Sequence, residues 1–155
     1  MGLDMFLKAE KHASGYSFSP EQDKEIYNRV VDSVGARPFA DRNTPSVDVT
    51  VAVGYWRKAN AIHGWFVKEC QDNVDECQQT WIPRDKLREL KDLCLEVLAD
   101  KSKAEELLPT TQGFFFGSND YDESYFQDLK QTVEITKKVL EEIPEGWDIY
   151  YRSSW

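Results

Sequence analysis

Alternation of apolar and polar residues predicts three β-strands in this chain. Apolar side chains occupy the odd positions of residues 3–9 and 47–53 and positions 147, 149 and 151 of residues 147–153, with mostly polar side chains between them. A period of two places every second side chain on one face, which is typical of a strand with one buried face. The valines of 47–53 favour a strand further, because β-branched residues suit a pleated surface.

Apolar residues spaced three and four apart predict helices between the strands. This pattern covers four segments, which are residues 20–34, 56–70, 83–98 and 120–143. A short helical turn is also predicted after the third of them. Ser19 precedes Pro20 as a predicted N-cap, and Ser102 with Glu105 forms a predicted capping box for the short turn. Gly54 is predicted to end the valine strand.

The order of elements, β-α-β-α-α-α-β, predicts an α+β fold in a single domain spanning residues 1–155. A chain of 155 residues has the usual size of one domain and can bury a core without metal or disulfides. We expect the three strands to share one small, mostly antiparallel sheet, with the helices packed mainly on one face and the 56–70 helix lying across it. Residues 114–116 are a candidate for an extra strand.

Net charge and cysteine content limit the cellular compartments and the classes of binding partner that we expect. The chain has 28 acidic and 19 basic residues and a net charge of −9, whereas proteins that bind duplex phosphates carry a basic excess, so we expect no duplex nucleic acid as a partner. The three cysteines form no C-x-x-C motif, which favours reduced thiols and a cytoplasmic protein. No run of 18 apolar residues occurs, and charged residues near the start argue against a signal peptide, so we expect no membrane contact.

The segment 55–63 carries the most informative chemistry. Arg57 and Lys58 are predicted to lie in the first turn of the 56–70 helix, where the positive end of the helix dipole disfavours cations. A bound anion would reverse this penalty. Trp56, Asn60 and His63 are spaced to lie on one flank of that helix, where they can recognise a nucleobase or a ribose. In the alternative interpretation, Trp56 and His63 pack in the core while the two cations pair with surface acids.

Two further segments add candidate residues. The aromatic stretch 114–116, which includes Phe115, lies between glycines, and it can wall a pocket, join copies of the chain as a homo-oligomer, or form a buried strand. Arg152 in the last strand can clamp a phosphate in a bidentate manner. The alternative for Arg152 is an ion pair with Asp4 or Asp48 across the sheet.

The usual catalytic residue sets are missing. His12 and His63 are the only histidines, they form no H-x-x-x-H pair, and no cysteine stands at metal-ligand spacing, so no metal or other cofactor is expected. The chain also lacks the G-x-S-x-G motif of serine hydrolases. These absences favour a binding protein over an enzyme, with no catalytic residue predicted.

Several segments resemble a known group of proteins from end to end. They are residues 1–5, 54–60, 107–109, 113–118 and 150–155, and they are similar to segments of small uncharacterised proteins carried by bacteriophages and bacteria. The resemblance implies no catalytic residue. In size and lifestyle the group is similar to phage proteins that sequester the nucleotide signals of bacterial immunity, which implies the cytosol of a bacterial host.

We therefore expect a non-catalytic binding protein for a small anionic, nucleotide-like ligand, such as a phage sponge for an immune signalling nucleotide. The alternatives are a nucleotide-processing enzyme of the phosphodiesterase or hydrolase type and an acidic protein-binding inhibitor. The predicted ligand-binding residues are Trp56, Arg57, Lys58, Asn60, His63, Phe115 and Arg152.

Overall fold

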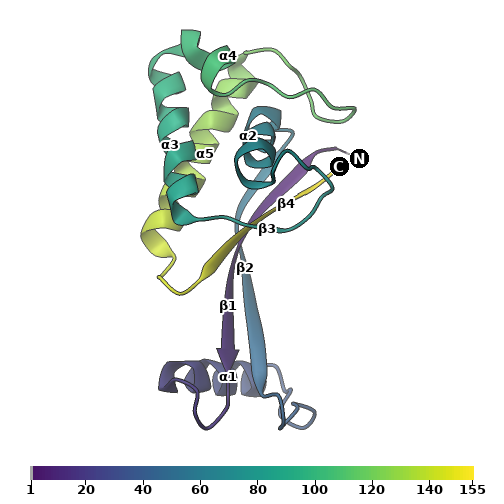
Figure 1. Cartoon of the computed structure of the whole chain (residues 1–155), viewed down its shortest axis with the longest axis vertical. Coiled ribbons are helices and arrows are strands. Elements are labelled where there is room, and N and C mark those ends of the chain that lie inside the picture. The colour runs from purple at the N-terminus through teal and green to yellow at the C-terminus, as the bar shows by residue number, and fades with distance from the viewer. Residues whose placement is uncertain (1) are drawn as a thin grey trace. The chain divides into compact units, whose positions relative to one another are not determined.

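The protein is an α+β fold with one four-stranded antiparallel sheet, described here by a computed structural model that covers residues 2–155. Met1, the first residue of the resembling segment 1–5, lies outside the described residues. The elements follow the order β1 (Asp4–Ser14), α1 (Glu21–Ser33), β2 (Ser46–Arg57), α2 (Asn60–Cys70), β3 (Thr80–Trp81), α3 (Arg84–Ala99), the 3-10 turn η1 (Lys101–Lys103), α4 (Ala104–Leu107), α5 (Glu123–Glu142) and β4 (Asp148–Ser154) (Figure 1).

The chain forms two compact units. The main unit comprises the residues up to Ala9 together with Ala52–Trp155, and the hairpin unit comprises Glu10–Val51. The long strands β1 and β2 run through both units. That the whole chain behaves as one domain stays a prediction.

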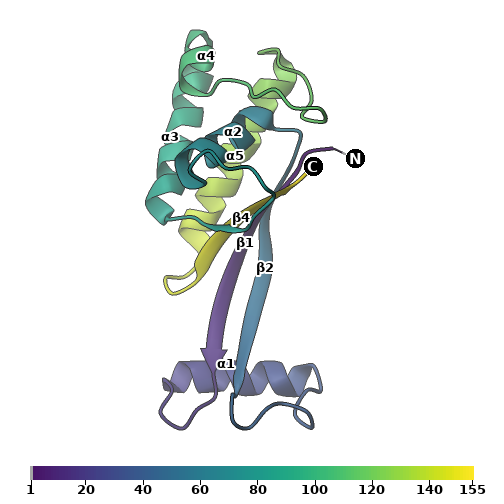
Figure 2. The same cartoon turned by 45° about the vertical axis from the view of Figure 1, so that its right-hand side comes forward.

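The main unit is built on a sheet with strand order β2-β1-β4-β3, and α2, α3 and α5 lie on the same side of it in both views (Figures 1 and 2). Strands β1, β2 and β4 confirm the three predicted strands and their shared sheet. The odd positions of β1 and the predicted faces of the helices supply its core, including Leu3, Met5, Leu7, Ile62, Phe66, Leu87, Leu90, Cys94, Leu129 and Tyr151. The ring of Phe66 in α2 stacks on Tyr151 in β4 at 4.0 Å between centroids, which fixes α2 on the sheet.

The hairpin unit has a much smaller core than the main unit. Tyr27 and Val31 of α1 are buried together with Ala13 of β1, whereas Phe18 and Phe39 are almost fully exposed. The predicted helix is present, but the predicted Ser19 cap is wrong, because Pro20 occupies the N-cap without a side-chain hydrogen bond. The hydroxyls of Ser19 and Ser14 instead bond to each other at 2.7 Å.

Several predicted boundaries are corrected by the structure. Strand β2 continues past Gly54 to Arg57, so α2 begins only at Asn60. The short turn after α3 is capped by Asp100, whose carboxylate accepts from the Ser102 N–H at 3.1 Å, and not by a box formed with Glu105. Residues 114–116 lie in a turn and a bend, and the fourth strand is the unpredicted β3, which pairs antiparallel with β4.

Gly54 is required for close packing, which explains why a glycine stands within a strand. A Cβ added there would lie 2.6 Å from Cγ2 of Ile135 on α5, which is too close for two carbon atoms. We expect Gly54→Ala to lower the free energy of unfolding by about 1–3 kcal/mol through overpacking. Chemical denaturation of Gly54→Ala, Ile135→Ala and the double variant measures the coupling, because Ile135→Ala removes the colliding methyl group. Additive losses in the double variant would contradict this contact.

Candidate functional site

Trp56, predicted as a stacking surface for a ligand, lies in the core. It is fully buried in β2, packs edge-on against Phe66, and donates its indole N–H to Oγ1 of Thr132 on α5 at 2.9 Å. A ring enclosed by its own fold offers no face to a ligand. The alternative interpretation of Trp56 as a packing residue therefore fits the structure.

Arg57 and Lys58 do not lie in the first turn of a helix. Arg57 ends β2, and its guanidinium pairs with the Asp4 carboxylate at 3.1 Å. Lys58 takes a left-handed backbone conformation with a φ of 59°, and its N–H donates to the Leu3 carbonyl at 2.8 Å. This bend turns the chain from strand to helix, so the two cations precede the start of α2 at Asn60.

Asn60 fastens the loop that follows α4. Its side-chain amide donates to the carbonyls of Phe116 at 3.1 Å and Ser118 at 2.7 Å, and its Oδ1 accepts from the Thr111 N–H at 3.1 Å. The side chain is buried, and three of its hydrogen-bonding positions are used within the fold. Asn60 thus holds both ends of residues 111–118 rather than presenting its amide to a ligand.

A small cavity of about 130 Å³ lies at the start of α2, and we call it the acidic cavity. It brings together Arg57, Lys58 and Asn60 from the predicted site, but Asp120, Asp122 and Asp128 also line it. Burial, and then the neighbouring Asp122, raises the pKa of Asp128 to about 6. A wall with three carboxylates is a poor place for an anion, so the predicted anion site at this helix start is not favoured by the geometry.

A second and larger cavity, of about 520 Å³, is lined in part by the loop that Asn60 holds, and we call it the aromatic cavity. It contains His63 and Phe115 from the predicted site. The lining residues are His63, Gly64, Val67, Lys68, Asn73, Asp75, Thr111, Gln112, Gly113, Phe114, Phe115, Phe116 and Trp155. Its volume is within the usual range for small-molecule sites.

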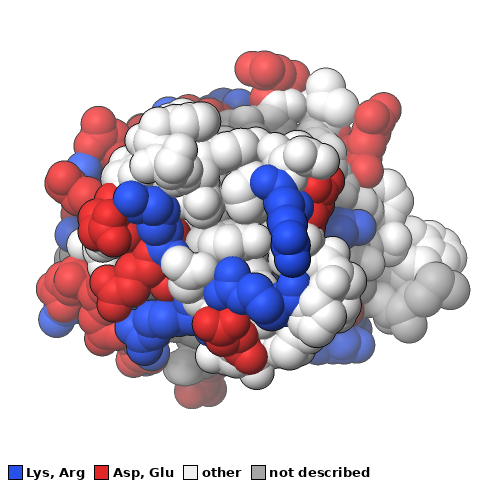
Figure 3. All heavy atoms as spheres, turned by 90° about the horizontal axis from the view of Figure 1, so that it is seen from below, with Lys and Arg blue, Asp and Glu red and all other residues white. Residues whose placement is uncertain are grey.

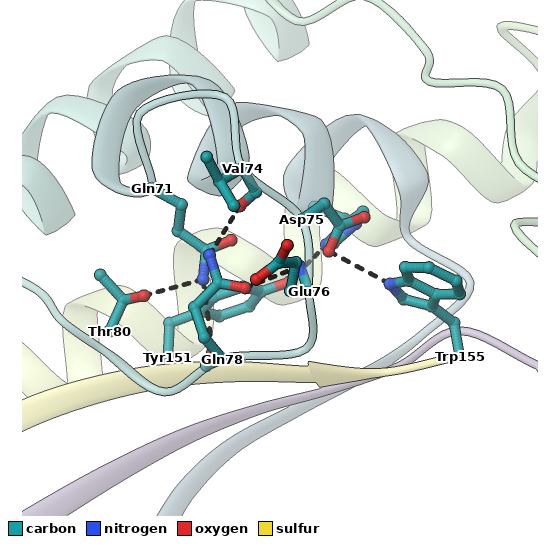
Figure 4. Close-up of polar contacts among 9 residues, drawn as sticks. Gln71, Val74, Asp75, Glu76, Gln78, Thr80, Tyr151 and Trp155 are labelled. Atoms are coloured by element: carbon teal, nitrogen blue, oxygen red, sulfur yellow. Dashed lines mark hydrogen bonds and ion pairs between the residues drawn. The ribbon is translucent and has the colours of Figure 1, made fainter.

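The floor of the aromatic cavity is a hydrogen-bonded chain through His63. Nδ1 of His63 lies 2.8 Å from the Tyr151 hydroxyl and Nε2 lies 2.9 Å from Oδ2 of Asp75. Burial raises the pKa of Tyr151 well above its ordinary value, so the phenol keeps its proton. Each ring nitrogen of His63 thus has one partner within the fold, which fixes the orientation of the ring. The other oxygen of Asp75 accepts from the Trp155 indole at 3.1 Å (Figure 4).

A cross-linked loop after α2 holds Asp75 in place. Gln71 donates to Oγ1 of Thr80 at 2.9 Å, and Gln78 donates to the Val74 carbonyl at 2.6 Å while it accepts from the Glu76 N–H at 2.7 Å (Figure 4). The backbone on both sides of Asp75 is thus tied to the Gln78 side chain. The carboxylate is positioned before any ligand arrives, as preorganised sites require.

Aromatic rings form one wall of this cavity. Phe116 is buried and meets His63 edge-on at 5.1 Å and Trp155 at 6.0 Å. Phe115 is half-buried, whereas Phe114 is 93% exposed and Trp155 is 48% exposed. A Cβ at Gly113 would lie 2.4 Å from the Phe116 ring, so the glycine lets the turn close over that ring.

Arg152 lines neither cavity. It is exposed in β4, where alternation turns its side chain away from the face that buries Tyr151. Neither Asp4 nor Asp48 pairs with it, because Asp4 pairs with Arg57 and Asp48 contacts His12 at 2.7 Å.

Within the described part of the chain, two cysteines are held as thiols and no cluster of metal-binding side chains is present. Burial raises the pKa of Cys70 to about 11 and that of Cys94 to about 12, so both stay protonated at neutral pH. Among residues 2–155, no group of three or more His, Cys, Asp or Glu side chains is arranged to hold a metal ion. No helix within the same range is long and apolar enough to cross a membrane.

Comparisons of the chain with protein-family models, with curated proteins and with solved structures found no match.

Removing the charge of Asp128 should stabilise the protein at pH values above the raised pKa of this carboxyl group. The native carboxyl holds its proton more tightly than the unfolded chain, whose pKa is about 3.9. The native state thus binds more protons between about pH 4 and pH 6, and stability falls as pH rises through that window. We expect Asp128→Asn to gain about 1–2 kcal/mol near neutral pH, allowing for solvent screening, and almost nothing near pH 4. Denaturant melts at both pH values measure this, and an equal gain at both would contradict it.

Asn60 offers a matched pair of variants that separate its two roles. Asn60→Ala should remove the acceptor for the Thr111 N–H and release the loop, whereas Asn60→Asp keeps that acceptor but loses the two donors to Phe116 and Ser118. Amide hydrogen exchange should therefore show lost protection at Thr111 in the alanine variant and retained protection in the aspartate variant. Equal exchange at Thr111 in wild type and Asn60→Ala would rule out this anchoring role.

Proposed function

We propose that the protein is a non-catalytic binding protein for a small nucleotide-like ligand, whose planar base enters the aromatic cavity. The observation that carries the proposal is the wall of Phe115, Phe116 and Trp155 beside the fixed His63–Asp75 pair. Aromatic faces accept any nucleobase by stacking. The Asp75 carboxylate, already held by two donors, has remaining lone pairs that suit the N–H groups of a base edge.

The outer part of the cavity suits the anionic portion of such a ligand. Lys68 lines the cavity with a largely exposed side chain, and Phe114 at the loop tip can close over a bound group. Lys68 also pairs with Glu69 at 3.3 Å, so a ligand phosphate would compete with a surface ion pair that contributes little.

The hydrogen bonds of the polar side chains in the cavity favour binding of the ligand over its conversion. His63 is 1% exposed and both of its ring nitrogens bond within the fold, so the imidazole is directed at Tyr151 and Asp75 rather than at a ligand. A binder without turnover lowers the free concentration of its ligand. The resemblance to phage proteins makes the signalling nucleotides of bacterial immunity the first ligands to test.

An acidic inhibitor that mimics nucleic acid is less well supported. Figure 3 shows Lys and Arg side chains interspersed with Asp and Glu on the face it presents, separated by uncharged surface. A mimic of a nucleic-acid backbone needs a continuous acidic face, and this face does not provide one.

Phe114 and Trp155 provide the test. Isothermal titration with mononucleotides and cyclic dinucleotides should reveal a ligand, and Phe114→Ala or Trp155→Ala should weaken its binding about tenfold or more, because a stacked base contributes about 1–3 kcal/mol. Phe18→Ala is the matched control, since Phe18 is 82% exposed in the hairpin unit. Melting temperatures should stay close to wild type in the Phe114→Ala and Phe18→Ala variants.

The same samples separate binding from turnover. Chromatography after incubation should recover the ligand intact and in stoichiometric amount from heated protein. Catalytic consumption would instead favour the nucleotide-processing enzyme. Unchanged affinity in both cavity variants, or no binding to any member of the panel, would contradict the proposed function.

A further inference from the structure

The two edges of the sheet differ in how well they are protected. The order β2-β1-β4-β3 leaves β2 and β3 at the edges, and β3 is only two residues long. Strand β2 has twelve residues, and its segment Ser46–Val51, which lies in the hairpin unit, contains no Lys, Arg or Pro. Proteins usually block an edge by shortness, charged side chains (lysine above all), bulges or proline. The short β3 follows that rule, whereas Ser46–Val51 carries a single charged side chain, Asp48.

Two contacts define the pairing of β2 with β1 inside the hairpin unit. The Gly15 N–H donates to the Pro45 carbonyl at 2.7 Å, and the side chains of His12 and Asp48 meet at 2.7 Å. Both contacts fit one antiparallel alignment, with His12 opposite Asp48. Backbone groups alternate in direction along such a strand, so those of Asp48 point away from β1, toward the free edge, and the same alignment extended along β2 gives those of Thr50 this direction too.

We propose that this edge pairs with the same edge of a second copy of the chain, antiparallel and centred on Val49. In that register Val49 lies opposite its own copy, and Val47 lies opposite Val51. The outward backbone groups of Asp48 then meet those of Thr50, as the hydrogen-bonded pairs of an antiparallel ladder require. The Thr50 hydroxyl also faces the Asp48 carboxylate, which gives each carboxylate a donor across the interface.

Competing registers are less favourable. A pairing centred on Asp48 would set two carboxylates directly opposite each other, which is destabilising. A shift by one residue would oppose valines to polar side chains and misalign the outward backbone groups. A pairing centred on Thr50 would extend beyond Val53, where the buried face of β2 changes from odd positions to Trp56. The Val49 register keeps residues 47–51 paired within the segment and sets no two carboxylates opposite each other.

A second copy fits this edge for two reasons. The segment is complementary to itself, so a two-fold axis through Val49 pairs the outward backbone groups of Asp48 with those of Thr50 without a different sequence. The hairpin unit also gains most from association: it buries few apolar residues, its valines at 47 and 49 are half-buried, and Val51 is 45% exposed. Its charge is nearly balanced, with seven acidic and five basic residues, so two copies repel little.

Sedimentation velocity tests the pairing on the full chain. Wild type should sediment as a dimer at micromolar concentration. Thr50→Pro removes one outward N–H while leaving the β1 side of the strand intact, and it should weaken dimerisation at least tenfold. Thr50→Ala keeps that N–H and loses only the hydroxyl donor to Asp48, so it serves as the matched control that should weaken dimerisation much less than Thr50→Pro. A monomeric wild type, or a Thr50→Pro variant that dimerises like wild type, would overturn the proposal.

Cysteine cross-linking tests the register. Residues opposite each other in a non-hydrogen-bonded pair have Cα atoms about 4.5 Å apart, which suits a disulfide. Val49→Cys should therefore form a covalent dimer under mild oxidation, whereas Val47→Cys, which faces Val51 of the second copy, should not. Wild type under the same oxidation controls for the chain's own three cysteines. Cross-linking of Val47→Cys but not Val49→Cys would overturn the register, and a mixed dimer with an unrelated protein would overturn the choice of partner.

Discussion

A buried imidazole needs a partner for each ring nitrogen, and the way His63 meets this need organises much of the main unit. An unpaired nitrogen in the core would cost about 1–3 kcal/mol. His63 avoids that cost by joining three parts of the chain: Tyr151 of β4, Asp75 of the loop after α2, and, through Asp75, Trp155. The sheet, the helix and the aromatic cavity are therefore linked by one set of hydrogen bonds, and the polar floor of the cavity is also a structural joint.

Much of the fold follows from short-range patterns. Alternation identified the buried face of β1, and the three-and-four spacing identified the buried residues of α3, such as Leu87 and Cys94. These patterns are reliable because each depends only on where one element faces the core. The boundary between β2 and α2 was less predictable. Tyr55 and Trp56 extend the strand, as aromatic residues commonly do. The turn depends on a positive φ at Lys58, and a lysine in the sequence does not indicate such a conformation, as a glycine would.

The candidate site depends on contacts between residues that are distant in sequence, and a local sequence pattern does not predict such contacts. His63 and Phe115 do line the aromatic cavity, but Asp75 and Trp155 were missed, because they lie 80 residues apart in sequence and meet only through folding. Trp56 illustrates the opposite difficulty, since an aromatic residue beside cations suits a ligand site and a core equally well. Burial decided between them, and burial depends on α5, which packs Thr132 against the indole.

The position of Trp155 gives the aromatic cavity its own optical reporter. Of the tryptophans, Trp81 and Trp155 are the exposed ones, at 53% and 48%, while Trp56 is fully enclosed. Indole emission depends on water contact and on nearby carboxylates, and Trp155 has both, with Asp75 hydrogen-bonded to its ring nitrogen. Occupancy of the cavity would therefore change the colour and quenching of the chain's intrinsic fluorescence. A Trp81→Phe background would leave Trp155 as the main solvent-accessible emitter and allow this signal to be followed without any attached dye.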